Sequence, residues 1–226
     1  MPKLFIVSTP IGNLEDMTFR AVRVLKEVNL IAAEDTRHTR KLLSHFDIHT
    51  RMESFHEHNE QVAAGRFVEI LKSGKNVALV SDAGTPAISD PGFRLVRAAI
   101  EAAIEVEAIP GASAVITALA VSGIPTDQFT FIGFLPDKGG KRKNKLTELK
   151  DLQHTLVFYV SKWKVEKVLS DMIEVFGDRN AVLCRELTKM HEEVVRAPLS
   201  KILENVKGRE VKGELTLVVG AEDVSV

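Results

Sequence analysis

Four short polar stretches carry the residues whose types and spacing could bind a small ligand. Each follows an apolar run and is rich in Gly, Pro, Ser, Thr or acidic residues: loop 1 (residues 8–13), loop 2 (34–37), loop 3 (81–92) and loop 4 (110–113). Backbone N–H groups near Gly12, Gly84 and Ser113 could bond to an adenine, a ribose or a carboxylate. No stretch matches a nucleotide-phosphate fingerprint, so a phosphate cradle is not expected.

The elements around these loops predict how they are positioned. Apolar runs predict buried strands over residues 4–7, 30–33, 77–80 and 106–109. Helix patterns follow over 18–28, 41–43, 61–73, 93–104 and 114–121, with Asp16 or Thr18 as the first cap and residues 51–59 irregular. Alternating strands and helices predict a parallel sheet covered on both faces, which brings all four loops to one edge. Each loop alone could be a simple turn; four on one edge favour a ligand site.

The second part of the chain has a different pattern. A plausible boundary at Ile124 and Pro125 gives two α/β domains, residues 1–124 and 125–226. Strands are predicted over 129–134, 156–160, 181–184, 193–196 and 215–219, and helices over 165–176 and 199–206. Antiparallel neighbours are expected, because residues 193–196 follow Cys184 without room for a crossover helix.

Composition limits the partners and the compartment. The net charge is −1 and the sequence pI is near 6.7, so contact with a nucleic acid must come from a local patch. A single cysteine, Cys184, excludes a disulfide within the chain, and its apolar run predicts burial despite the adjacent Arg185. No leader-like or membrane-spanning run is evident, so a soluble cytoplasmic protein is expected.

Two polar segments contain residues that could bind a metal ion or a nucleic acid. The spacing of His56 and His58, near His45 and His49, favours a solvated loop over a metal site, and no metal is expected. No Ser–His–Asp arrangement is evident. The densest cationic segment covers residues 137–145, and its glycines predict mobility. Its natural counterpart is a polynucleotide backbone, through Lys138, Lys141, Arg142, Lys143 and Lys145; the alternative is a solvated surface loop.

Several motifs together resemble a known family. They are STPIGNLEDMTFRA, AEDTRHTRKLL, SFHEHNE, VALVSDAGTPAISDPG, PGASAVITAL and GFLP, which occur in this order over nearly the whole chain. They resemble the tetrapyrrole methylase superfamily of S-adenosylmethionine-dependent methyltransferases. Within it, the chain is similar to the branch that methylates the 2′-hydroxyl of a cytidine in small-subunit ribosomal RNA. The resemblance implies two α/β domains with the cofactor in the cleft between them, and a homodimer.

The resemblance also implies which residues contact S-adenosylmethionine. Carried over by motif, these are Pro10, Asp82, Gly84, Thr85, Pro86, Ser113, Ala114, Phe158, Tyr159, Arg185, Glu214 and Leu215. One stretch departs from the branch, which usually reads Tyr-Glu-Ser-Pro-His-Arg after the strand ending at Tyr159. Here residues 160–164 read Val-Ser-Lys-Trp-Lys, so a carboxylate and an arginine are absent. Lys164 keeps a positive charge without a guanidinium's bidentate geometry.

A ribose hydroxyl attacks a methyl group well only once its proton leaves. Asp35 is the hypothesised proton acceptor, with Arg37 holding a phosphate or the ribose; the alternative is that Asp35 caps the helix that follows. Two rival functions are methylation of a tetrapyrrole-type macrocycle and RNA binding without catalysis. The cationic segment and the EDTR and HEHNE matches argue against the first, and residues 160–164 leave the second open.

Overall fold

The computed structural model describes residues 1–221, and their contacts divide the chain into two compact units between Ser113 and Ala114. The helix at the division, α5 (Ala114–Ser122), packs against a strand of the second unit. The predicted domain boundary after residue 124 stays a prediction.

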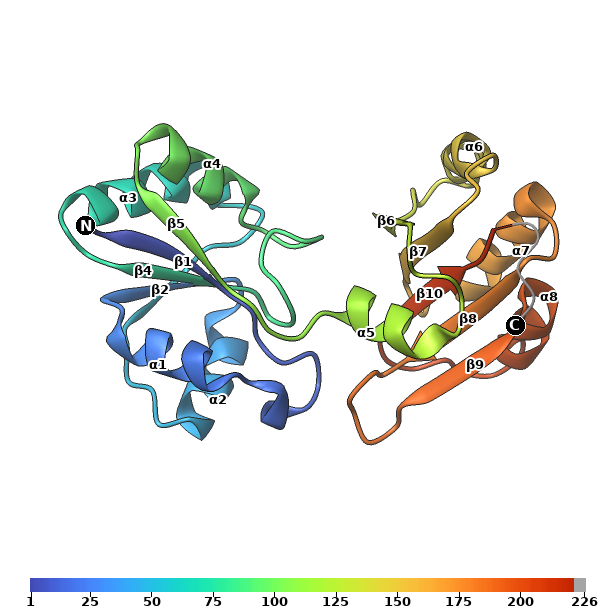
Figure 1. Ribbon diagram of the computed structural model, residues 1–226, viewed down its shortest axis with the longest axis horizontal. Coiled ribbons are helices and arrows are strands. Elements are labelled where there is room, and N and C mark those ends of the chain that lie inside the picture. Colours follow the sequence, from blue (N-terminus) through green and yellow to red (C-terminus); the bar gives the residue numbers. More distant parts are fainter. Residues whose placement is uncertain (222–226) are drawn as a thin grey trace. The chain divides into compact units, whose positions relative to one another are not determined.

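The first unit is a five-stranded sheet with helices on both faces (Figure 1). Its elements are β1 (Lys3–Val7), the 3-10 turn η1 (Leu14–Asp16), α1 (Phe19–Glu27), β2 (Leu30–Ala33), α2 (Thr36–His45), β3 (Met52–Ser54), α3 (Glu60–Lys72), β4 (Val77–Val80), α4 (Phe93–Glu101) and β5 (Glu105–Ile109). The strand order is β3-β2-β4-β1-β5, and every neighbouring pair is parallel. The parallel sheet predicted from strand–helix alternation is therefore confirmed.

Strand side chains alternate between the two covered faces, as a two-residue period requires. Val77 and Leu79 of β4 pack in the cluster that includes α3 and α4 residues. Ala78 and Val80 pack in the other cluster, with residues of α1 and α2. The Thr18 hydroxyl accepts a hydrogen bond from the Ala21 N–H at 3.0 Å and so caps α1, as expected.

Two local expectations for this unit are wrong. The segment expected to be irregular contains β3, an edge strand held by its parallel pairing with β2. Its three residues are too few and too polar to show a strand pattern. The short helix expected around residues 41–43 is α2, which spans Thr36–His45.

The second unit is also a five-stranded sheet, in the order β6-β7-β10-β8-β9 (Figure 1). Its elements are α5, β6 (Phe129–Phe134), α6 (Gly139–Leu149), β7 (Thr155–Val160), α7 (Val165–Phe176), β8 (Asn180–Arg185), β9 (Glu193–Pro198), α8 (Leu199–Val206) and β10 (Leu215–Val219). Of the four neighbouring pairs in the described part of this sheet, β6–β7 is parallel and the other three are antiparallel, so the expected antiparallel neighbours are confirmed. Helices α6, α7 and α8 bury one face of the sheet.

Candidate functional site

The carboxyl edge of the first sheet gathers the four polar loops. They follow β1, β2, β4 and β5, which are parallel and adjacent in the sheet. Parallel strands release their following loops at the same edge, where ligands bind in open α/β sheets. The predicted convergence of the loops is confirmed.

Loops 1 and 3 are hydrogen-bonded to each other. Thr9 and Gly84 exchange both backbone bonds, at 2.9 and 3.0 Å, and the hydroxyls of Ser8 and Thr85 are 2.9 Å apart. The Gly84 N–H therefore donates to Thr9. This corrects the expectation that it is free to bond to a ligand. Gly84 has φ +78°, a conformation that strains any residue with a Cβ.

Loop 4 packs closely against loop 1. A Cβ added at Gly111 would lie 2.9 Å from Ser8 Cβ, so glycine is required for this approach. A Cβ at Gly84 would meet Ile11 Cγ2 at 3.5 Å and the Ala112 carbonyl oxygen at 3.8 Å. Three loops thus converge on a buried residue without a side chain, and this holds the neighbouring, partly exposed Asp82 and Thr85 in place.

Loops 2 and 3 are joined by a reciprocal pair of bonds. The Asp35 N–H donates to Asp82 Oδ1 at 3.1 Å, and the Asp82 N–H donates to Glu34 Oε2 at 3.2 Å. Asp82 therefore holds loop 2 in position, a structural role that the sequence did not indicate.

The pKa values of the two adjacent carboxylates of loop 2 are shifted in opposite directions. Burial raises the pKa of Glu34 above its ordinary value; the bond from the Asp82 N–H acts against this, and the charges of Asp82 and Asp35 act with it. Hydrogen bonds from the Arg37 side chain and backbone hold the pKa of Asp35 well below its usual range. Asp35 Oδ1 accepts the Arg37 N–H at 2.8 Å and caps α2, so the capping alternative is confirmed. Of these two carboxylates Glu34 has the raised pKa, a difference that the sequence did not indicate.

Loop 3 also holds strained backbone. Ala87 and Ser89 have φ of 69° and 61°, which residues with a Cβ rarely adopt. The Ala87 N–H donates to the Pro91 carbonyl at 3.2 Å, which helps to hold the turn. Such strain is concentrated at ligand-binding and catalytic sites.

The structure buries several residues expected to contact the cofactor. Pro10, Gly84 and Pro86 are buried, whereas Asp82, Thr85, Ser113 and Ala114 are partly exposed. In the second unit Phe158 and Leu215 are 0% and 3% exposed and lie in the hydrophobic core. Their side chains pack inside the sheet, so a contact of these two residues with the cofactor would have to come from backbone, and it stays a prediction.

The other three second-unit residues expected to contact the cofactor lie at one edge of their sheet. Leu215 pairs with Val160 on one side and Arg185 on the other, which brings Tyr159, Arg185 and Glu214 near the same strand ends. Arg185 Nε donates to Glu193 at 2.8 Å. The Glu214 N–H donates to Glu186 at 2.9 Å.

The cationic segment is the helix α6, so the expectation of mobility is wrong. Arg142 is 5% exposed; its Nε donates to Asp171 at 2.7 Å and its Nη1 to the carbonyl of Asp137 at 3.0 Å. Its guanidinium is thus unavailable to a phosphate, a correction to its predicted role.

The other four cations of the segment divide into two kinds. Lys143 pairs with Glu174 at 2.6 Å, and Lys145 with Glu148 at 2.8 Å. Lys138 and Lys141 are exposed, and neither forms an ion pair with any residue among 1–221. These two lysines therefore remain available to an anionic partner.

Cys184 and the histidines are the chain's candidates for a reactive thiol and for metal ligands. Cys184 is buried as predicted, and burial raises its pKa to about 11, so the thiol is inert. Within residues 1–221, no three His, Cys, Asp or Glu side chains are grouped so that they could hold a metal ion.

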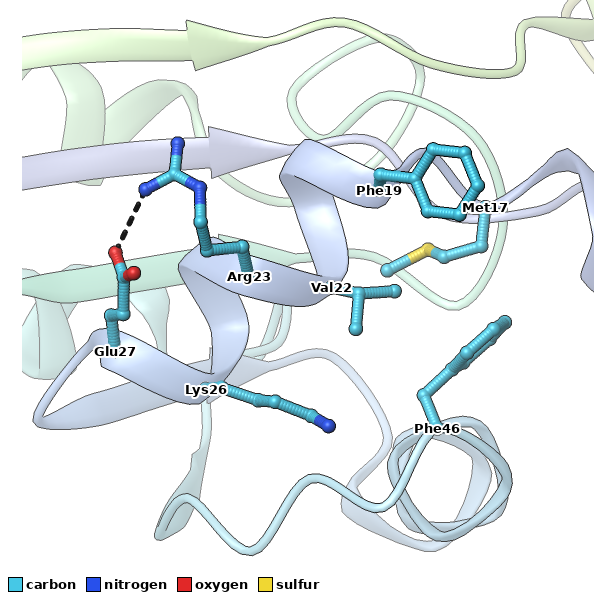
Figure 2. A pocket seen from close by; sticks show the side chains of 7 residues that line it. All are labelled: Met17, Phe19, Val22, Arg23, Lys26, Glu27 and Phe46. Atoms are coloured by element: carbon cyan, nitrogen blue, oxygen red, sulfur yellow. Dashed lines mark hydrogen bonds and ion pairs between the residues drawn. The ribbon is translucent and has the colours of Figure 1, made fainter.

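An apolar hollow of about 560 Å³ lies beside α1, and no residue of the four loops lines it (Figure 2). It is lined by Met17, Phe19, Val22, Arg23, Lys26, Glu27 and Phe46. None of the predicted site residues lines it. Phe19, at its mouth, is 98% exposed.

Comparison with known proteins identifies the class of protein that has this fold. The profile of the Tetrapyrrole (Corrin/Porphyrin) Methylases family matches residues 3–203, and the chain belongs to this family. The chain is 51% identical over 216 residues to the Ribosomal RNA small subunit methyltransferase I of Halalkalibacterium halodurans, with 96% of this chain and 75% of the relative covered. It is 49% identical over 221 residues to the protein of the same name from Vibrio cholerae serotype O1, with 96% and 77% covered.

Solved structures share the fold at low sequence identity. A uroporphyrin-III-C-methyltransferase from Thermus thermophilus is similar with a TM-score of 0.68 at 19% identity, covering 97% of this chain and 94% of that one. A diphthine synthase is similar with a TM-score of 0.75 at 15% identity, covering 100% and 92%. The predicted two-sheet α/β fold is thereby confirmed. No helix among residues 1–221 is long and apolar enough to cross a membrane.

Proposed function

We propose that the protein transfers a methyl group from S-adenosylmethionine to the 2′-hydroxyl of a cytidine in small-subunit ribosomal RNA. The observation that carries this proposal is the identity of 51% over 96% of the chain to a protein named for methylation of that RNA. The choice of the ribose hydroxyl and of cytidine rests on the branch-specific motifs. The cofactor follows from membership of a methylase family.

The loop edge of the first sheet fits such a cofactor. S-adenosylmethionine supplies an activated methyl group, so the protein's main task is to position the reactants. Backbone around Gly84 and the partly exposed Asp82, Thr85 and Ser113 would bind polar groups of the cofactor. We propose that Tyr159, Arg185 and Glu214 also contact the cofactor. Pro10 and Pro86, which are buried, would support the residues that make these contacts.

The proton of the attacking hydroxyl needs an acceptor. Asp35 remains a prediction for this role, but its bonds to Arg37 make it a weak base. The raised pKa of Glu34 brings that carboxylate closer to the operating pH, where general bases work best. We therefore propose Glu34 as the acceptor, with Asp35 orienting the exposed Arg37 toward a phosphate or the ribose.

Contact with the RNA backbone would come from unpaired cations. We propose Lys138 and Lys141 as phosphate contacts, with Lys143 and Lys145 contributing only if their ion pairs open. An RNA substrate in ribosomes also supports a cytoplasmic location.

We further propose that the protein forms a homodimer. The exposed ring of Phe19 beside the apolar hollow of α1 is the kind of surface that a second copy would cover. Sedimentation of the wild type and of Phe19→Glu tests this. A wild type that sediments as a monomer would contradict the dimer.

The function itself is tested with purified protein, labelled S-adenosylmethionine and small ribosomal subunits from a strain lacking this activity. Nuclease digestion and nucleoside mass spectrometry should find 2′-O-methylcytidine. A porphyrinogen precursor serves as the competing substrate. Label in the macrocycle alone, or in neither substrate, would overturn the proposal.

A further inference from the structure

The turn between β7 and α7 presents the chain's one tryptophan to solvent. Trp163 is 78% exposed, although large rings are usually mostly buried in a folded domain. The Lys162 Nζ lies 4.8 Å from the centroid of a Trp163 ring, a cation–π contact. A cation on one face, together with this exposure, leaves the other face of the indole open to a second flat group.

Other aromatic rings lie at the same edge of the second sheet. β6 and β7 are parallel, so Phe134 at the end of β6 and Tyr159 near the end of β7 lie where the Trp163 turn emerges. The Phe134 and Tyr159 ring centroids are 5.6 Å apart, and Phe134 is 61% exposed. Aromatic surface at this edge is therefore not confined to one side chain.

Unpaired cations lie next to this turn. Lys164 forms an ion pair with Asp137, which ties the turn to the start of α6. Lys138 follows Asp137 directly, and Lys141 lies one helical turn further on. Exposed rings beside cations that lack partners among the described residues are the combination that binds single-stranded nucleic acid, by stacking on bases and pairing with phosphates.

We propose that the Trp163 turn is a stacking platform for an unpaired base of the RNA substrate, with Lys138 and Lys141 contacting neighbouring phosphates. This inference rests on the proposed function, because it assumes that the substrate is RNA. It assigns a function to residues 160–164. Where the branch that the chain resembles usually has a carboxylate and an arginine, this chain has an indole between two lysines. The platform would set substrate affinity and leave the methyl-transfer step unchanged.

Intrinsic fluorescence tests the contact directly, because Trp163 is the only tryptophan of the chain. Wild-type protein is titrated with an oligocytidylate of about 12 nucleotides, within the usual site size for single strands. Anisotropy of an end-labelled copy measures binding independently. Emission should be quenched and acrylamide should reach the indole less readily. No binding, or binding that leaves emission and acrylamide access unchanged, would overturn the platform.

Three variants test its contribution to turnover on small ribosomal subunits. Trp163→Ala should raise KM by about 10-fold or more, and Trp163→Phe, which keeps a flat ring, should stay within about threefold. Both should keep the wild-type kcat and S-adenosylmethionine affinity. Phe129→Ala, at the opposite end of β6 and 40% exposed in the wild type, is the matched control and should behave as wild type.

The outcomes separate this inference from the proposed function. If wild type methylates the subunits but Trp163→Ala has an unchanged KM, the platform is wrong and the function stands. If wild type does not methylate the subunits, the function itself fails. A fall in kcat with unchanged KM would also overturn the platform, since stacking of a remote base should act on binding.

Discussion

A methyl group added at Gly111 should destabilise the first unit, because loops 1 and 4 touch at this glycine. In Gly111→Ala the new Cβ would lie 2.9 Å from Ser8 Cβ and 3.4 Å from the Ser8 carbonyl oxygen. Carbon atoms prefer a separation of about 3.5–4.0 Å, so one loop must move by roughly 0.5–1 Å. Ser8 cannot yield freely: its N–H donates to Ile109 and its hydroxyl lies 2.9 Å from that of Thr85.

Overpacking of this kind costs about 1–3 kcal/mol, and the loss of glycine's freedom in the unfolded chain offsets about 0.4–1 kcal/mol. We therefore expect a net destabilisation of about 1–2 kcal/mol. Gly65→Ala is the matched control, since Gly65 lies within α3 and nothing lies within 4 Å of its added Cβ. In a helix interior the same change should stabilise by about 0.5–1 kcal/mol.

Urea unfolding followed by far-UV circular dichroism measures both changes, because both glycines lie in the first unit while Trp163 lies in the second. Calorimetry should also show weaker S-adenosylmethionine binding in Gly111→Ala, by about 3–10-fold if the Ser8–Thr85 contact is lost. The control should bind normally. Stability changes of the same sign in both variants, or a Gly111→Ala protein with wild-type stability and affinity, would refute the packing argument.

Glu34→Gln should lower kcat about 10²–10⁴-fold, whereas Asp35→Asn, which keeps a helix cap, should cost much less; equal losses would contradict the choice of Glu34. Because burial raises the Glu34 pKa, the folded state binds its proton more tightly than the unfolded chain does. Wild type therefore gains stability as pH falls through that pKa, so Glu34→Gln should be at least as stable as wild type at neutral pH and lose the advantage in acid. Arg142→Met should lower stability in urea unfolding by less than the loss of about 3–5 kcal/mol expected for a buried charge left unpaired, because Lys143 Nζ still lies 3.8 Å from Asp171 Oδ1; a wild-type midpoint would speak against a buried pair. Lys141→Met should leave stability unchanged and flatten the slope of log affinity for RNA against log salt by roughly 0.7–0.9; an unchanged slope would remove Lys141 from the interface. The Cys184 thiol should react with an aromatic disulfide reagent only after denaturation, and rapid reaction of native protein would contradict its burial.

The backbone-level features of the site could be predicted from the sequence. Apolar runs of four or five residues, each followed by polar turn residues, specify buried parallel strands and the edge where their loops meet. That inference needs only the order of elements, and the β1, β2, β4 and β5 loops lie as expected. The three-residue edge strand β3 could not be found in this way, because its register is set by its pairing with β2 and by no pattern of its own.

The state of individual charged side chains could not be predicted, because it depends on partners far away in the sequence. Gly139 and Gly140 led to the prediction that the cationic segment is a mobile loop. The structure makes it a helix, in which Leu146 and Leu149 pack into the core and Arg142 reaches Asp171 on α7. Charge density alone therefore overstated the number of available cations: Arg142 is buried, Lys143 and Lys145 form ion pairs, and Lys138 and Lys141 have no ion pair among the described residues.

The same argument applies to the two acidic residues of loop 2, which are neighbours in the chain and differ by one methylene. Asp35 has Arg37 two residues ahead, and this local contact is the main cause of its lowered pKa. Burial raises the pKa of Glu34, and this shift is opposed in part by the bond from the N–H of Asp82, which is 48 residues away in sequence and reaches loop 2 because β2 and β4 are adjacent strands. A general base needs the second environment rather than the first. The sheet order thus sets the different environments of the two carboxylates, which is why the sequence could locate loop 2 at the predicted edge but could not distinguish the pKa values of its two acids.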